Sequence, residues 1–560
     1  KAKIAAECAL EHGVLSVRDV VLRNQLDIAP EALNLLFAGI TPPADLGPYR
    51  YQTPDGNTAF EVSIDTEVQE GEITKGAACL GSSGQYQYYT VKAGAINPQT
   101  GVGAVMKQQV QGVGLALIRF GVFYERDLEI NPGATMNFTG PVHANGDLYM
   151  SPDGSTLSFH DRVTSHGDMY RYRKDKSGTT GVVAIDNNNG YATTMSSDST
   201  DPYWMINSIW LWGGRVQSKS HGVQKLSPPI NPVDEPHDLI ERPLAVAASN
   251  YNAETEGEKF YNKACLRITV SSNKVFTAVD SRGVDMTFCF TNPAALVTNG
   301  TYSSKPLFTK NANGSYKFYK EGAYDVSQNN FYDAREGCYM RPVDIYVDQL
   351  LAKFPAVADL TYSVAEGRGV VYVTRDDPDA AHSGYQPCLR IRNGVSLPSG
   401  GLTFASDLPI YIEGDYNTNH EPALAVGDAV TVLSRNWQDA KSAACLSDRV
   451  ASNANVNVVI MTGNSETYSG SYNGGLENVI RFLEGWSGKT VNYSGAIIDL
   501  WYSEAVTNCW SYSAGYYTAP TRNWSYDEIY RTQVPPGMTH VFGLEEITWT
   551  ETTWANEGWN

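Results

Sequence analysis

The chain has 560 residues, 42% of them apolar, which is enough for a folded protein of about two to four domains. Its formal net charge of −19, without any run of Lys or Arg, argues against a nucleic-acid phosphate backbone as a partner. With 50 glycines, 34 tyrosines and 27 prolines, the composition favours β structure with many turns.

The first two segments in chain order are a helical segment at 1–45 and a small β subdomain at 46–118. In the helical segment, Ile4, Ala5 and Cys8 fall on one helical face, and we expect Gly13 to break that pattern. Pro30 is typical of the first turn of a second, short helix. From 46 the residues alternate between polar and apolar, as in AFEVSID at 59–65, which indicates strands.

A repeated phrase marks the next segment, 119–214. PVHANGDLYM at 141–150 returns as RVTSHGDMYR at 162–171, so that Gly146 and Gly167 stand 21 positions apart. A spacing of about 20 residues fits one coil of a stacked β-solenoid, whose coils bury their apolar faces against each other. In such a stack, residue 143 aligns with Thr164. The alternative is that both phrases are ordinary hairpin turns.

The repeat returns downstream in IYIEGDYNTN at 410–419, after a segment of different texture. We therefore predict a solenoid in two parts, 119–214 and 386–545, separated by an inserted α+β domain at 215–385 and followed by a tail at 546–560. The spacing of Leu476, Val479, Ile480 and Leu483 predicts one amphipathic helix at 475–486. The predicted fold class is mainly β: a parallel β-helix-like body, a helical N-terminal segment and an α+β insertion.

Phrases over most of residues 120–545 resemble the PilX-like proteins, which are large minor-pilin-type proteins of type IV pilus systems. The matching phrases are FGVFYERDLEINPG at 120–133, GPVHANGDLYM at 140–150, PHDLIERP at 236–243, FYDAREG at 331–337, PCLRIRNGVSLPSGGLTF at 387–404, PIYIEGDYNT at 409–418 and QVPPGMTHV at 533–541. The opening AAECALEHGV looks like the stretch that follows the membrane helix in these proteins.

The resemblance implies a location and a role more than a chemistry. It implies a place in the cell envelope or on the extracellular surface, with pilus or pseudopilus subunits as partners and self-association into a homo-oligomer or filament. Family members carry an apolar N-terminal helix, through which alone they contact the membrane. Because the chain opens on Lys1 and not on Met, we expect its natural N-terminus to lie upstream.

Asp415, Asn417, Asn419 and Glu421 alternate in GDYNTNHE, and oxygen donors at this spacing resemble part of a calcium loop. They are the candidate metal ligands, and Ca²⁺ is the one cofactor that we predict. The competing interpretation is that these side chains satisfy backbone groups at solenoid corners.

Two other groups of side chains are candidates for a functional role. His143, His160 and His166 lie within one or two predicted coils. There they converge on a metal, form an acid-base pair with nearby aspartates, or bond neighbouring backbone. Trp549, Trp554 and Trp559 close an aromatic-rich C-terminal region, which favours a capping or interface role over the binding of surface glycans. The eight cysteines include no CxxC pair, so either disulfides or free thiols are compatible with their spacing.

The sequence contains no nucleophile elbow, Walker loop or HExxH motif. We therefore expect a non-enzymatic cell-surface protein, a structural or adhesive component of a type IV pilus-like system. The alternative is a secreted β-helix enzyme acting on polysaccharides, because parallel β-helices carry paired carboxylates in many such enzymes.

Overall fold

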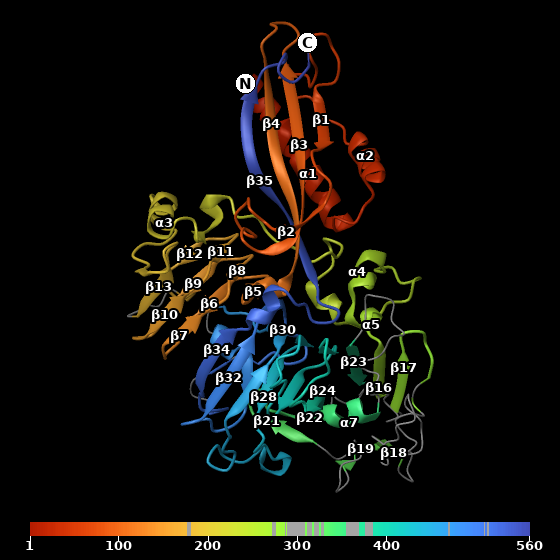
Figure 1. Cartoon of the computed structure of the whole chain (residues 1–560), viewed down its shortest axis with the longest axis vertical. Coiled ribbons are helices and arrows are strands. Elements are labelled where there is room, and N and C mark those ends of the chain that lie inside the picture. The colour runs from red at the N-terminus through yellow and green to blue at the C-terminus, as the bar shows by residue number, and fades with distance from the viewer. Residues whose placement is uncertain are drawn as a thin grey trace.

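The computed structural model describes residues 1–175, 181–270, 276–285, 287, 308–310, 316–318, 324–325, 330–353, 369–375, 385–468, 471–508, 510–511 and 515–559. The fold is mainly β, with 38% strand and 16% helix, and most of its sheets are parallel. Figure 1 shows a narrow upper part that holds both chain ends, and a wider lower part built from the parallel sheets. We call them the head and the body.

The head is an antiparallel sheet covered by an N-terminal helix. The helices are α1 (Ala2–Asn24) and α2 (Pro30–Ala38), and the strands are β1 (Phe60–Ile64), β2 (Gln69–Glu72), β3 (Ser83–Ile96), β4 (Gly103–Ala116) and β35 (His540–Thr552). The strand order is β1-β3-β4-β35, with β2 also paired to β3. The predicted helical segment and β subdomain are thus two layers of one unit, and the C-terminal strand completes its sheet.

Two expectations about the head are wrong. Helix α1 runs through Gly13 without a break, and a Cβ there would lie 2.5 Å from Cγ1 of Val91 on β3. Glycine at this position therefore lets the helix approach the sheet closely. The boundary predicted at 546 falls inside β35, which pairs with β4 as far as Thr552, because backbone pairing continues past the last buried residues.

The body contains an eleven-stranded sheet whose neighbours are parallel except at one edge, where β16 and β17 are antiparallel. Its strands, in spatial order, are β15 (Val216–Gln217), β11 (Val163–Ser165), β8 (Val142–Ala144), β5 (Val122–Tyr124), β33 (Ile497–Tyr502), β30 (Val459–Asn464), β27 (Ala423–Val426), β25 (Leu402–Ala405), β23 (Val370–Arg375), β16 (Leu266–Val270) and β17 (Phe276–Asp280).

The strand order gives an unusual chain path. The chain enters the sheet in the middle at β5 and advances through β8 and β11 to β15 at one edge. It then crosses to β16 near the opposite edge and returns through β23, β25, β27 and β30 to β33, which pairs with β5. The two parts of the predicted body thus meet edge to edge in one sheet, and the chain leaves the body beside its point of entry.

The two copies of the 21-residue repeat pair with each other in parallel, residue by residue. Val142 pairs with Val163, His143 with Thr164 and Leu148 with Met169, all in parallel, so the predicted alignment of 143 with 164 is confirmed. A Cβ on Gly167 would lie 2.6 Å from the backbone carbonyl of Gly146 on the preceding copy. Because neighbouring corners approach so closely, this corner requires glycine.

Four further sheets belong to the body. A six-stranded sheet, parallel beyond its first antiparallel pair, consists of β21 (Phe331–Asp333), β22 (Cys338–Tyr346), β24 (Tyr385–Arg392), β26 (Ile410–Glu413), β28 (Val430–Leu433) and β31 (Ile480–Phe482). The second sheet consists of β6 (Leu128–Ile130), β9 (Leu148–Met150) and β12 (Met169–Tyr170). The third consists of β7 (Met136–Phe138), β10 (Thr156–Phe159), β13 (Val182–Asp186) and β14 (Ala192–Thr194). The fourth consists of β29 (Ala454–Asn457), β32 (Thr490–Gly495) and β34 (Thr521–Tyr526).

Apolar side chains from these sheets meet in one large core, which includes Val142, Leu148, Leu157, Ile410 and Ile460. A small antiparallel sheet, β18 (Phe308–Lys310), β19 (Tyr316–Phe318) and β20 (Tyr324–Asp325), lies apart from them. The short helices are α3 (Trp204–Trp212), α4 (Ala253–Glu258), α5 (Phe260–Lys263) and α7 (Val347–Lys353), with 3₁₀ turns η1 (Leu117–Arg119), η2 (Lys219–His221), η3 (Pro236–Leu239), η4 (Asp439–Lys441), η5 (Leu476–Asn478) and η6 (Glu528–Arg531). No helix among the described residues has the length and apolar character needed to cross a membrane.

The body differs from the expectations in two places. The predicted insertion at 215–385 supplies β16, β17 and β23 to the eleven-stranded sheet and β21 and β22 to the six-stranded sheet, so these strands form no sheet of their own. The helix predicted at 475–486 is wrong: this stretch holds η5 and strand β31. A short apolar run such as this one is compatible with a helix or a strand. In the structure it forms a strand, because it pairs with β28.

Candidate functional site

The outer face of the six-stranded sheet carries charged side chains. On β24, Leu389 and Ile391 point into the core, while the intervening Arg390 lies on the opposite face, as alternation along a strand requires. The parallel register aligns Arg390 with residues of the neighbouring strands. We call this row the polar rung: Asp344, Arg390, Tyr411, Thr431 and Arg481. All five side chains are buried, because chain segments cover this face.

Arg390 is the most heavily bonded member of the polar rung. Its Nε and Nη2 donate to the two carboxylate oxygens of Asp344 at 2.5 and 3.0 Å. Nη1 and Nη2 donate to Asp439 at 2.6 and 3.0 Å. Burial opposes the charge of the guanidinium, but the two carboxylates raise the pKa of Arg390 well above its usual value. This cation is therefore fixed in place by two bidentate partners.

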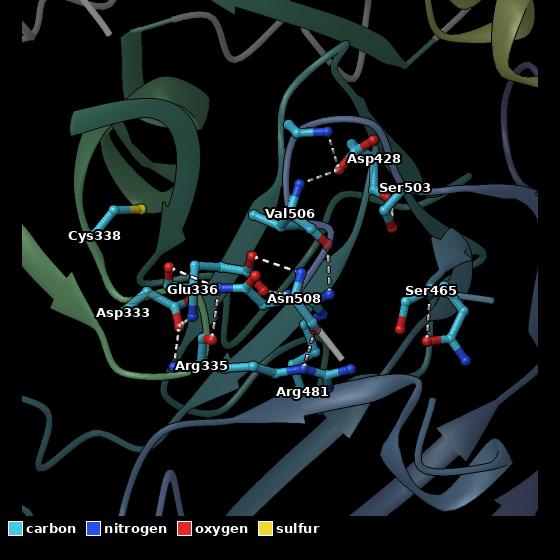
Figure 2. A network of polar contacts seen from close by, with 12 residues as sticks. Asp333, Arg335, Glu336, Cys338, Asp428, Ser465, Arg481, Ser503, Val506 and Asn508 are labelled. Atoms are coloured by element: carbon cyan, nitrogen blue, oxygen red, sulfur yellow. Dashed lines mark hydrogen bonds and ion pairs between the residues drawn. The ribbon is translucent and has the colours of Figure 1, made fainter. Parts of the chain in front are cut away.

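The other end of the polar rung is closed by the segment around 333–336 (Figure 2). Arg481 forms an ion pair with Glu336 at 2.5 Å and donates to the carbonyl of Val506 at 2.7 Å. Glu336 in turn accepts from the backbone N–H of Asn508 at 3.1 Å. Burial, together with the charge of Arg481, lowers the pKa of Arg335 to about 9. The network fastens the 503–508 loop to the sheet.

Near Arg390 the charged cluster opens to solvent in a groove of about 820 Å³. Arg392 bonds Tyr346 at 3.0 Å and forms an ion pair with Glu413, and Asp415 forms one with Arg435. Further lining residues are Asn330, Asn393, Val395, Gly414, Trp437, Gln438, Asp439 and Ala440. The Arg435 side chain is 62% exposed, so it can meet a ligand. Such mixed charge suits a polar ligand with many hydrogen-bonding groups.

The four predicted calcium ligands do not all face this groove. Only Asp415 lines it. Each of the four accepts a hydrogen bond from a backbone N–H: Asp415 from Asn455, Asn417 from Glu421, Asn419 from Leu397 and Glu421 from Gly400. These are the corner contacts of the competing interpretation. Calcium binding by these residues stays a prediction.

The three predicted histidines each contact different residues. His143 is buried between Thr164 and Asn145 and stacks on Phe123, and burial lowers its pKa to about 4. His160 contacts Asp186 at 3.0 Å, and His166 bonds the carbonyl of Val223. Each ring therefore serves a local contact and the three form no cluster.

The C-terminal tryptophans lie on the head. Trp549 is 45% exposed, with Nζ of Lys3 4.9 Å from its ring centroid. Trp554 packs over Gly94, where a Cβ would lie 2.6 Å from its ring, and it contacts Trp559. An interface role for these tryptophans stays a prediction. Among the cysteines, Cys8, Cys79, Cys265, Cys338, Cys388 and Cys445 are free thiols.

Sequence reasoning missed the polar rung because its members come from five strands that are separated in the chain. One local signal was present: the alternation in CLRIRN at 388–393 places two arginines opposite two core residues. Comparisons with protein-family models, with curated proteins and with solved structures gave no match.

Proposed function

We propose that this chain is a non-enzymatic cell-surface protein, a structural or adhesive component of a type IV pilus-like system. The observation that carries the proposal is the head. There a 23-residue N-terminal helix packs on an antiparallel sheet, and both chain ends lie at the tip, away from the body (Figure 1). The body is inserted between β4 and β35, so this head presents a large domain at a distance from the tip.

In this proposal the body is a stacked parallel β-helix made of two runs of coils. Supporting it are the in-register pairing of β5, β8 and β11, the matching register of the smaller parallel sheets, and the continuous strand order of the eleven-stranded sheet. Parallel strands covered on both faces make a stiff unit. The partners would be pilus or pseudopilus subunits contacting the head, with filament formation through repeated copies.

The adhesive part of the proposal concerns the groove beside Arg390. Its exposed Arg435 and its acidic and amide side chains are groups that bind hydroxyl-rich ligands such as surface glycans. The charges beneath the groove are fixed by the bonds of Arg390 and Arg392, so the surface groups are held in place before a ligand arrives.

Cell fractionation tests the pilus assignment. We expect an antibody against the native protein to detect it with the filaments that are sheared from intact cells, together with a known pilus subunit. A cytosolic marker protein is the control for lysis. Recovery of the protein with that marker, and not with the filaments, would contradict the proposal.

Glycan binding tests the groove. We expect Arg435→Ala to weaken binding to any glycan that the purified protein retains on an array by about tenfold, since a hydrogen bond to a charged group contributes roughly 1.5–3 kcal/mol. Arg531→Ala is the matched control, because Arg531 is likewise an exposed, ion-paired arginine but lies outside the groove. Equal binding by wild type and Arg435→Ala would remove the groove from the proposal.

One observation favours the polysaccharide-active enzyme as a second candidate. The Asp407 side chain is 9% exposed and lies 3.3 Å from Arg242, and its burial raises the pKa of this carboxyl to about 7, a value suited to general acid catalysis. Incubation of the protein with the same glycans gives the test. Turnover that Asp407→Asn abolishes would replace the structural proposal with the enzymatic one.

A further inference from the structure

A second cluster of charged side chains lies where turn η3 and the 503–508 loop meet the end of β27. His237 on η3 contacts three carboxylates there. Its Nε2 lies 3.3 Å from Asp428, and its Nδ1 lies 3.3 Å from Glu241 and 3.7 Å from Glu504. One ligand atom each from His237, Glu241 and Glu504 lie within 4.8 Å of one another. Three donors this close can share one cation.

Asp428 fixes the direction of the imidazole ring. The Asp428 carboxylate is buried and accepts from the backbone N–H groups of Glu504, Ala505 and Val506 at 2.6, 3.2 and 3.2 Å. Its remaining contact is with Nε2 of His237, which leaves Nδ1 facing the two glutamates. Metal-binding histidines are commonly held by a carboxylate on the other ring nitrogen in this way.

The loop that carries Glu504 is fastened on both sides (Figure 2). Ser503 donates to the carbonyl of Asp428 at 2.9 Å, and Arg481 donates to the carbonyl of Val506 at 2.7 Å. The Glu504 side chain itself is 72% exposed. Its backbone is therefore positioned while its carboxylate stays free to turn toward a ligand, so little ordering is needed on binding.

The cluster is also net negative, because three carboxylates surround one imidazole. A cation that binds Nδ1 of His237 displaces any proton on that nitrogen, and the proton leaves to solvent. The positive charge of the cation then balances the negative charge of the carboxylates. One nitrogen and two carboxylate oxygens form a donor set that suits zinc better than calcium, which prefers oxygen alone.

We propose that Nδ1 of His237 and the carboxylates of Glu241 and Glu504 bind a zinc ion, with Asp428 as the residue that positions His237. The site is separate from the calcium residues predicted at 415–421. It lies on the body, where η3 of the crossing segment meets the second run of strands. Zinc bound there would join η3 to the 503–508 loop and so stabilise the folded body.

Calorimetric titration of the untagged protein with ZnCl₂ tests the site. We expect one zinc ion per chain, with an affinity that Glu504→Gln and Glu241→Gln each reduce by at least about tenfold. Because Glu504 is exposed, its substitution leaves folding intact. Glu254→Gln on α4 is the matched control, since Glu254 is exposed and outside the cluster.

A thermal melt gives a second measurement. Zinc is expected to raise the melting temperature of wild type and of Glu254→Gln, but not that of Glu504→Gln, and CaCl₂ at the same concentration is expected to have no such effect. Absence of saturable binding would overturn the proposal. So would zinc binding that Glu504→Gln and Glu241→Gln leave unchanged, because the ion would then be held elsewhere.

Discussion

Arg390→Met is expected to destabilise the protein by about 3–5 kcal/mol, because it leaves the buried Asp344 carboxylate without its bidentate partner. Methionine keeps much of the side-chain volume, so the loss reports on charge and not on a cavity. The measurement is the urea midpoint of unfolding, followed by tryptophan fluorescence.

Arg435→Ala is the matched control for this prediction, since Arg435 also pairs with an aspartate but is mostly exposed. An exposed ion pair contributes only about 0–1 kcal/mol, so its midpoint should stay near that of wild type. Adding Asp344→Asn to Arg390→Met should recover part of the loss, because the buried charge that has lost its bonds to Arg390 is removed. If Arg390→Met unfolds at the same urea concentration as Arg435→Ala, the polar rung does not stabilise the body.

Glu477→Gln is expected to stabilise the protein at alkaline pH, with little change at acid pH. Glu477 is buried on η5, accepts from the N–H of Asn131, and burial raises its pKa to about 7. In the unfolded chain the pKa of a glutamate is about 4.3. The folded state therefore keeps a proton that the unfolded state loses between these two values.

This difference in pKa makes the wild-type protein less stable as the pH rises. The stability that protonated Glu477 contributes is complete below about pH 4.3 and is lost as the pH rises through about 7, a loss on the order of 3 kcal/mol. Glutamine stays neutral throughout. The melting temperature of Glu477→Gln minus that of wild type should thus increase from pH 5 to pH 8. Glu254→Gln on the exposed surface of α4 is the control, and an equal dependence on pH for both variants would contradict the prediction.

Local sequence patterns predicted the strands that repeat close together in the chain. The 21-residue spacing predicted the alignment of His143 with Thr164, because consecutive copies pair with each other and share one register. The same reasoning missed strand β31, since the spacing of Leu476, Val479 and Ile480 fits a helix as well as a buried strand.

The candidate sites were less predictable than the strands. Asp415 was selected from its spacing and does line the groove, but Arg390, Asp344 and Arg481 were not selected. They lie on separate strands and become neighbours through parallel pairing alone. The cluster around His237 is similar, because Glu241 is near in sequence while Asp428 and Glu504 come from distant parts of the chain.

The mainly β class, the N-terminal helices and the repeated glycines Gly146 and Gly167 could be read from local patterns, because alternation and helical spacing act between residues that are close in the chain. No local pattern predicted that β5 pairs with β33, so that the chain enters and leaves the body at its middle, or that β35 completes the head. Such pairing depends on which strand edges remain unpaired after strands that are close in sequence have paired. That property belongs to the assembled sheets and leaves no pattern in any one segment of the chain.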